Sequence, residues 1–302
     1  HLRYIPMKRL IALFFVAIMF ASCQQEAPVE VLATTSVMAD AARQILPEQI
    51  QVVALMQSNI DPHSYKPVES DVAKLNSATI VLHNGLHLEG KMTDILEKVG
   101  RSKPVYAMSS ALKQNDLIEV GPNIHDPHIW FDLNLWARCV EGLGGFLALQ
   151  YPEHSDDIIA NTERYAAELR TAHADFATAL MDVPDSNRAM VTAHDAFSYF
   201  GRAFDIEVKG LQGVSTAAEF GVNDMRSTAE FIIERELTTV FTETSVNSKS
   251  IEALKEAVEQ KGGEVNLGEP LFSDALGEKG TPEATLIGAF KYNTTQILNS
   301  LK

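Results

Sequence analysis

The chain has little cysteine, no excess of basic residues and no long apolar run. Only two cysteines, Cys23 and Cys139, occur in 302 residues, which excludes a cluster of thiolate ligands and a framework of disulfides. The 40 acidic residues outnumber the 25 basic ones, whereas a nucleic-acid-binding surface is basic. No apolar run reaches the roughly 18 residues of a transmembrane helix. The acidic balance suits a small cationic ligand, and it suits simple solubility equally well.

Residues 1–22 are predicted to be a signal peptide. From Met7 the sequence reads MKRLIALFFVAIMFASC, in which two basic residues precede an apolar stretch that is too short to cross a bilayer but right for a signal peptide. Small residues directly before Cys23 resemble a bacterial lipobox, which implies cleavage there and lipid attachment to the sulfur. The alternative is an ordinary secretory signal with an incidental cysteine. Residues 1–6, before Met7, indicate a mis-set start.

Short β-rich runs alternate with amphipathic stretches over most of the chain, which predicts an α/β fold with mostly parallel sheets. The predicted strands are Val29–Thr34, Gln51–Leu55, Ala78–His83, Pro104–Ala107, Arg188–Thr192, Ile206–Lys209, Thr238–Thr242 and Glu264–Leu267. The predicted helices between them are Ser36–Leu46, Glu69–Ser77, Thr228–Glu236 and Ser248–Lys261.

Residues 155–183 differ from the rest because they hold no glycine or proline and show a helical apolar period. A helix of this length would span roughly 43 Å, enough to run along two small lobes. The predicted organisation is a lipidated tether at 23–29, an N-terminal α/β lobe at 30–154, a linking helix at 155–183 and a C-terminal α/β lobe at 184–302. Cys139 lies in an apolar stretch and is predicted to be a buried helix residue.

Three histidines stand out by their surroundings. His63 and His128 each follow Asp-Pro, a pair that resists helix and favours a rigid turn. His194 is placed two residues past the strand Arg188–Thr192. Asp274 follows the strand Glu264–Leu267 through a turn at Pro270. Because ligands of open α/β sheets bind beyond the carboxyl ends of the strands, these side chains suit a preformed site between two lobes.

Three neutral imidazoles and one carboxylate are ligands that suit zinc, manganese or iron(II). They suit calcium and magnesium poorly, because those ions prefer shells made of oxygen. Taken one at a time, each histidine fits a structural role better than the role of a ligand, so the residue types alone leave both interpretations open.

Six phrases occur in the order and spacing found in the zinc/manganese solute-binding proteins of ABC importers, the TroA-like metal-binding family. They are DPHSYKPVESDV, NGLHLEGKM, HDPHIWFDLNLW, TAHDAFSYFGRAF, KGLQGVSTAAE and LFSDALGEKGT. The resemblance covers about residues 29–302. It implies two Rossmann-like lobes joined by one long rigid helix. It also implies one Zn²⁺ or Mn²⁺ ion, transported rather than retained, held in the inter-lobe cleft by His63, His128, His194 and Asp274.

The resemblance further implies an exported, lipid-anchored protein on the periplasmic or cell-surface face of a membrane. Its expected partner is an ABC permease in the inner membrane, and it is expected to be a monomer. Many zinc-dedicated members carry a long His- and Asp-rich loop before the second histidine motif, whereas this chain has the short QNDLIEVGPNIHDPH. The cargo therefore stays open between zinc and manganese, with iron(II) as a further possibility and tighter binding expected for zinc.

Other polar residues are predicted to have lesser roles. His83 and His87 are expected to be structural, His125 a supporting or surface residue, and His154 and His173 solvated. Glu219 and Glu243 could orient ligands. An exported metallohydrolase is the alternative as an enzyme, but it would need an HExxH helix or a carboxylate cluster, and the sequence has neither. A surface adhesin of the same family is the other alternative.

Overall fold

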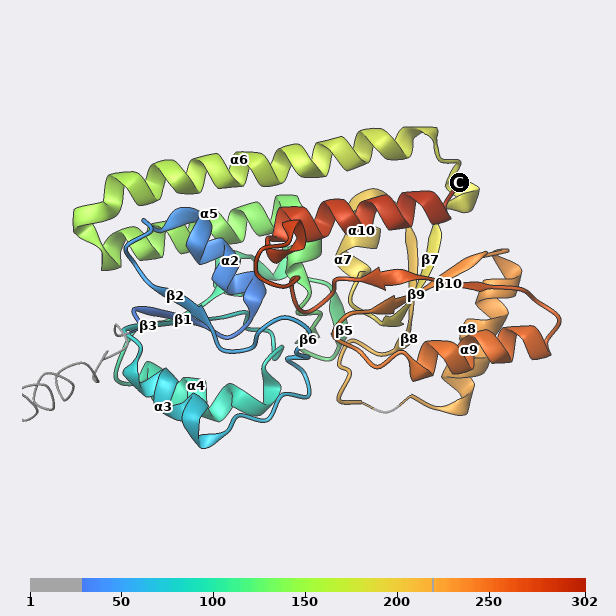
Figure 1. Ribbon diagram of the computed structural model, residues 1–302, viewed down its shortest axis with the longest axis horizontal. Helices are drawn as coiled ribbons and strands as arrows, with labels where there is room; N and C mark the ends of the chain where they lie inside the picture. The colour runs from blue at the N-terminus through green and yellow to red at the C-terminus, as the bar shows by residue number, and fades with distance from the viewer. Residues whose placement is uncertain (1–28, 219) are drawn as a thin grey trace, which may run out of the picture.

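The computed structural model describes residues 29–218 and 220–302, which form two α/β lobes under a layer of long helices (Figure 1). The predicted signal peptide and Cys23 lie outside the described residues. Among the described helices, none is both long enough and apolar enough to cross a membrane.

The first lobe is built on a parallel sheet with the strand order β2-β1-β3-β4. Its strands are β1 (Val31–Ala33), β2 (Val52–Ala54), β3 (Ile80–His83) and β4 (Val105–Ala107). Its helices are α2 (Ser36–Ile45), α3 (Glu69–Ser77), α4 (Thr93–Gly100) and α5 (Leu133–Gln150). Figure 1 shows α3 and α4 on one face of this sheet and α2 and α5 on the other. A small antiparallel hairpin, β5 (Glu119–Gly121) with β6 (Ile124–His125), leads into the second histidine turn.

The second lobe contains two parallel strand pairs, β7 with β8 and β9 with β10, and β7 lies beside β9. Its strands are β7 (Ala189–His194), β8 (Glu207–Gln212), β9 (Thr239–Glu243) and β10 (Asn266–Leu271). Its helices are α7 (Ser198–Phe204), α8 (Val222–Glu234), α9 (Lys249–Gln260) and α10 (Leu286–Ser300). Short 3-10 turns lie at Gly90–Met92, Met108–Ala111, Gln114–Asp116, Ile129–Phe131, Pro152–His154, Leu180–Asp182, Asp185–Asn187 and Pro282–Ala284.

The long helix α6 (Ser155–Ala179) runs over both lobes, as the sequence predicted (Figure 1). It ends before the predicted boundary at residue 183, because the chain tightens into a 3-10 turn at Leu180–Asp182. At its first-lobe end, the Tyr165 hydroxyl donates to the buried Asp40 of α2 at 3.0 Å. At its second-lobe end, the Phe176 ring lies 5.3 Å from that of Phe200 and 6.1 Å from that of Phe290, centroid to centroid. One hydrophobic core, to which these aromatic residues belong, continues from the first lobe into the second.

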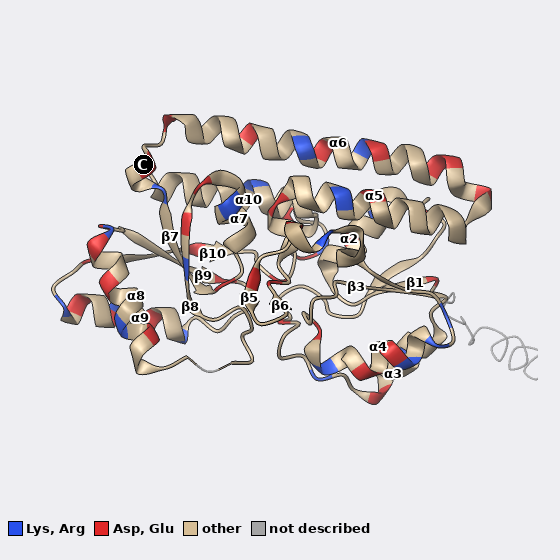
Figure 2. Cartoon of the chain, turned by 180° about the vertical axis from the view of Figure 1, so that it is seen from behind, with Lys and Arg blue, Asp and Glu red and all other residues tan. Residues whose placement is uncertain are grey.

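The packing of α6 on α5 depends on a glycine. A Cβ atom added to Gly144 of α5 would lie 2.9 Å from the Cβ of Thr162 on α6, which is closer than real contacts allow. Acidic and basic positions are interspersed along the outer face of α6 and along α3 and α4 (Figure 2). Neither colour alone dominates these three helices in this view, in keeping with the composition.

Three sequence expectations for the second lobe need correction. β7 continues to His194 rather than ending at Thr192, because β8 pairs with it as far as Gln212. β10 runs through Pro270, which was expected to form a turn; a strand at the sheet edge with an irregular register tolerates proline. Helix α8 begins at Val222 rather than Thr228, since Asp224 accepts a hydrogen bond from the Gly221 N–H at 2.7 Å and caps the first turn. Helices α4, α5, α7 and α10 were not among the predicted ranges.

Candidate metal centre

Two Asp-Pro-His turns supply the histidines of the first lobe. In each turn the aspartate accepts a hydrogen bond from the backbone N–H of the histidine, at 2.9 Å in Asp61–His63 and 2.8 Å in Asp126–His128. This side-chain-to-backbone bond makes the turn compact, and the intervening proline stiffens it. The turns follow β2 and β6, so both histidines reach the side of the first lobe that faces the second.

Two strands of the second lobe supply the other members. His194 is the last residue of β7, and Asp274 lies three residues beyond β10. The segment around Asp274 is also fixed to the first lobe, because the Trp130 indole N–H donates to the carbonyl of Ser273 at 3.1 Å. Both lobes therefore hold Asp274 in place.

The four side chains, which we call the metal cluster, converge at spacings expected of a coordination shell. The Nε2 atom of His128 lies 3.1 Å from that of His63 and 3.4 Å from that of His194. The Asp274 carboxylate lies 3.3 Å from Nε2 of His128, 3.3 Å from that of His194 and 3.8 Å from that of His63. A tetrahedral ion with ligands at about 2.1 Å has edges of about 3.4 Å. The spacing of the ligand atoms therefore matches the coordination shell of a small four-coordinate ion.

The members of the metal cluster are almost completely buried, with exposed fractions of 4% for His63, 1% for Asp274 and 0% for His128 and His194. Within the described residues, only imidazole nitrogens of the cluster face the carboxylate oxygens of Asp274, and no backbone or hydroxyl group donates to them. A buried carboxylate costs several kcal/mol unless a positive charge offsets it. The chemistry of the site therefore calls for a cation.

Two further carboxylates orient the histidines. Asp126 Oδ1 lies 2.7 Å from Nδ1 of His128, and Glu243 Oε2 lies 2.6 Å from Nδ1 of His194. Such a partner fixes the ring and turns Nε2 toward the metal position. No comparable partner for Nδ1 of His63 is found in the part of the chain that the structure describes.

The pKa values of the three histidines in the metal cluster shift in different directions: two are raised and one is lowered. Burial acts to lower the pKa of His128, but the carboxylates of Asp126 and Asp274 outweigh it and raise the value to about 9. Burial is likewise outweighed at His194, where Glu243 and Asp274 raise the pKa well above its usual range. Burial lowers the pKa of His63 to about 4, although Asp274 opposes the shift. Burial acts to raise the pKa of Asp274, yet the histidines hold it well below its ordinary value.

The structure brings together all four residues that the sequence singled out, His63, His128, His194 and Asp274. That they bind an ion remains a proposal. Glu243 lies where a ligand-orienting residue was expected, whereas Glu219 lies outside the described residues. Sequence reasoning missed Asp126 as the partner of His128, because an aspartate stands two residues before His63 as well and the sequence does not show which of the two bonds its own histidine ring.

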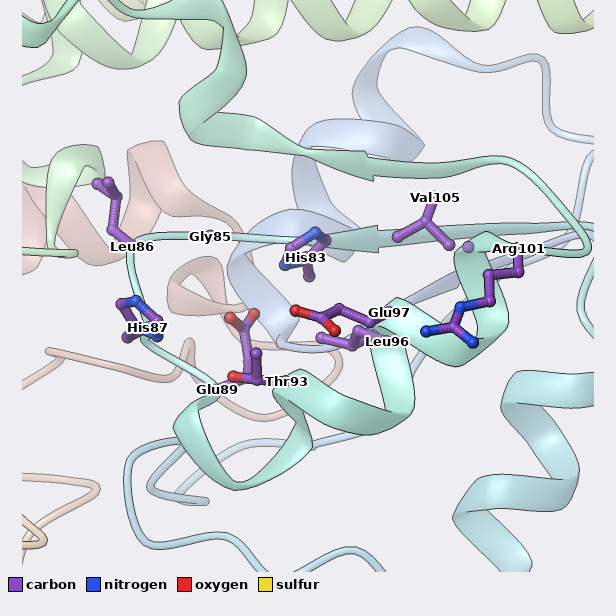
Figure 3. A pocket seen from close by; sticks show the side chains of 11 residues that line it. His83, Gly85, Leu86, His87, Glu89, Thr93, Leu96, Glu97, Arg101 and Val105 are labelled. Atoms are coloured by element: carbon purple, nitrogen blue, oxygen red, sulfur yellow. The ribbon is translucent and has the colours of Figure 1, made fainter.

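The remaining histidines stay apart from the metal cluster. His83 and His87 line a separate hollow of about 600 Å³ between β3 and α4, together with Glu89, Glu97 and Arg101 (Figure 3). His125 and His154 are partly exposed.

His173 was expected to be solvated, but this was wrong. Its ring packs 4.5 Å from that of Phe204, centroid to centroid, and its side chain is 15% exposed. The apolar face of α7 therefore covers this part of α6.

Comparisons with known proteins agree with this architecture. The sequence model of the family described as "Zinc-uptake complex component A periplasmic" (ZnuA) matches residues 31–300. The manganese-binding lipoprotein MntA of Bacillus subtilis is 41% identical over 274 residues, which cover 90% of each chain. The zinc-binding protein TroA of Treponema pallidum is 38% identical over 271 residues, covering 90% of this chain and 88% of that one. A solved structure of the periplasmic zinc-binding protein TroA superposes with a TM-score of 0.88 and 37% identity, covering 91% of this chain and 99% of that one.

Proposed function

Since this chain belongs to the family of periplasmic zinc-uptake components, we propose that it is the extracytoplasmic metal-binding component of an ABC importer. It captures one Zn²⁺ or Mn²⁺ ion with His63, His128, His194 and Asp274 and delivers the ion to the membrane permease. The observation that carries this proposal is the Asp274 carboxylate. It is buried and faces three imidazole nitrogens, and no other group of the described residues donates a hydrogen bond to either oxygen.

The site is built to hold an ion rather than to activate water. A catalytic zinc usually has three protein ligands and an open position for water or substrate. Here three imidazoles and one carboxylate complete a tetrahedral shell, and the surrounding side chains bury it. These features favour binding without catalysis over the alternative of an exported hydrolase. No feature of the described residues favours the adhesin alternative.

The donor set accommodates both ions but should favour zinc. Affinity for nitrogen and oxygen sites is lower for Mn²⁺ than for Zn²⁺, and zinc accepts four-coordination without distortion. Manganese gains from a fifth ligand, which Asp274 can supply because both of its oxygens face the cluster. A competition titration measures the preference, and manganese displacing zinc at equal concentration would contradict it.

Export and anchoring complete the proposal. We infer that Cys23 carries the lipid, that the protein works as a monomer, and that it meets its permease at the outer face of the inner membrane. Relatives that are called lipoproteins support the anchor. Stable anchoring requires more than one acyl chain, and we expect Cys23 to be the residue that carries them. A Cys23→Ala variant should therefore move from the membrane fraction to the soluble fraction. A wild-type protein that is already soluble after export would contradict the anchor.

The binding proposal is tested by elemental analysis of protein purified without added metal, followed by titration of His128→Ala and His83→Ala variants. We expect one ion per chain in the wild type and in His83→Ala, and a large loss of affinity in His128→Ala. His83 is the matched control because it is a partly buried histidine of the same lobe that lies outside the metal cluster. Full affinity in His128→Ala would refute the ligand assignment, and hydrolytic turnover by the loaded protein would favour the enzyme.

A further inference from the structure

A second hollow, of about 520 Å³, lies between the two lobes beside the metal cluster. Its lining comes from both lobes and includes Asp61, Ser64, Gln212, Thr216 and Ser245. Asp61 and Ser64 flank His63 in sequence, and Gln212 pairs with His194 across β7 and β8. The hollow, whose lining also includes Phe220 and Val246, therefore adjoins the metal cluster on the side of His63, which is the most exposed member of the cluster.

The two Asp-Pro-His turns use their aspartates differently. Asp126 turns inward, and its Oδ1 atom bonds the ring of its own histidine, His128. Neighbours fix that turn further, because Asn84 Nδ2 donates to the Pro127 carbonyl at 2.8 Å and the Tyr199 hydroxyl donates to the Asp126 carbonyl at 3.0 Å. The His128 turn is thus held from both sides, by Asn84 of its own lobe and by Tyr199 of the second lobe.

Asp61 turns outward instead. Its Oδ1 atom accepts the His63 N–H, while Oδ2 accepts the Ser64 hydroxyl at 2.6 Å and the Thr216 hydroxyl at 2.6 Å. Thr216 belongs to the second lobe, in the connection between β8 and α8. One carboxylate therefore holds the His63 turn and ties it to the opposite lobe across the hollow.

His63 needs such support more than the other histidines do. No carboxylate partner for its Nδ1 atom is found among residues 29–218 and 220–302, so the backbone turn through Asp61 is what orients it. A displacement of this turn would withdraw one ligand and open the metal cluster toward the hollow. His128, His194 and Asp274 would keep their places.

We propose that the Asp61–Thr216 hydrogen bond is a latch that keeps His63 on the ion and so limits the rate at which the ion leaves through the adjoining hollow. Asp61 and Thr216 are positioning residues in this scheme and do not touch the ion. The inference rests on the proposed function, since it assigns the rate of metal release to a particular contact.

The expected effect is kinetic. Removing the Thr216 hydroxyl breaks a hydrogen bond to a charged group, which corresponds to roughly a tenfold faster dissociation for a partly buried bond. The association rate constant should change little, because the Asp61 charge at the mouth of the hollow remains. The thermal midpoint of the metal-free protein should also stay close to that of the wild type, because Thr216 lies in a partly exposed connection.

The experiment measures release of Zn²⁺ from the loaded, full-length protein into excess chelator by stopped flow. Thr216→Val removes the hydroxyl at nearly constant volume, and Thr216→Ser restores it. Ser215→Ala is the matched control, because among the described residues the Ser215 hydroxyl accepts only from Ala217 N–H, at 3.3 Å, within the same connection. We expect fast release from Thr216→Val and near wild-type release from the other two variants.

A double-mutant cycle with Asp61→Ala separates the latch from general loosening. Alanine has no side-chain group that can pair with the Thr216 hydroxyl, so Thr216→Val should add nothing in that background. Equal release from wild type and Thr216→Val, or equal acceleration by Ser215→Ala, would overturn the latch while leaving the metal site intact. A wild-type protein that binds neither zinc nor manganese would instead refute the proposed function.

Discussion

Replacing Asp274 with asparagine removes the negative charge from the metal cluster while keeping the size of the side chain. In the native protein, one carboxylate oxygen lies 3.3 Å from Nε2 of His128 and the other lies 3.3 Å from Nε2 of His194. Whichever way the amide turns, its NH₂ group faces an imidazole nitrogen that we propose as a ligand of the ion. The substitution therefore removes a charge and also blocks a second ligand.

The magnitude follows from the burial of the pair. Removing one partner of a fully buried ion pair costs about 3–5 kcal/mol, whereas an exposed pair would contribute about 0–1 kcal/mol. Because each 1.4 kcal/mol corresponds to about a factor of ten, Asp274→Asn should weaken metal binding by roughly 10²–10⁴-fold. The buried value applies here because Asp274 is 1% exposed.

The assay is a competition titration against a chromophoric chelator, with thermal unfolding as a second readout. At a metal concentration about 100 times Kd, mass action stabilises the native protein by about 2.7 kcal/mol, which raises Tm by roughly 5–10 °C for a chain of this size. Asp274→Asn should lose that increase. Asp71→Asn is the control, since Asp71 is also buried but caps α3 away from the cluster. Wild-type affinity in Asp274→Asn would refute the argument.

Metal binding at pH 7 should release a proton from each of His128 and His194, because both pKa values are raised in the metal-free protein. Calorimetry in buffers of different ionisation enthalpy measures the number of protons released. The metal affinity should fall as the pH falls, because protons compete with the ion. For the metal-free protein, the raised pKa of His128 contributes stability that is present below about pH 6.5 and is lost as the pH rises through about 9, which denaturant titrations at pH 6 and pH 9 can test. Gly144→Ala should destabilise the fold by about 1–3 kcal/mol through overpacking against Thr162, with Gly145→Ala, whose Cβ would meet no neighbour, as the control in the same measurement. Cys139, which is buried and whose thiol pKa is raised by burial, should resist thiol reagents in the folded protein and react on unfolding; rapid labelling of the native protein would contradict its burial.

Much of the candidate site could be predicted because its signals are local. The tripeptide Asp-Pro-His sets a turn within three residues, and a parallel strand presents its carboxyl end to the cleft. The predicted strands lie within a few residues of their predicted positions because the β-rich runs that mark them are local signals as well. The ends of β7 and β10 were misjudged because pairing with a distant strand, rather than local composition, decides where they stop.

The partners of the two aspartates could not be predicted from the sequence. Asp61 and Asp126 stand in identical tripeptides, yet one bonds its own histidine ring and the other bonds Thr216, 155 residues away. Only the packing of the two lobes distinguishes them. The same holds for Glu243, whose position 2.6 Å from His194 depends on β9 lying beside β7.

The continuous core under α6 constrains how the protein can be recognised by its transporter. A helix anchored in both lobes by buried aromatic rings does not behave as a flexible hinge. A wide opening of the two lobes would separate packed apolar side chains and expose them to water. Rearrangements that accompany loading should instead be small sliding movements and local shifts of loops, such as the His63 turn. A permease that prefers the loaded form must therefore sense differences of loop position and surface charge near the cleft, rather than a change in overall shape.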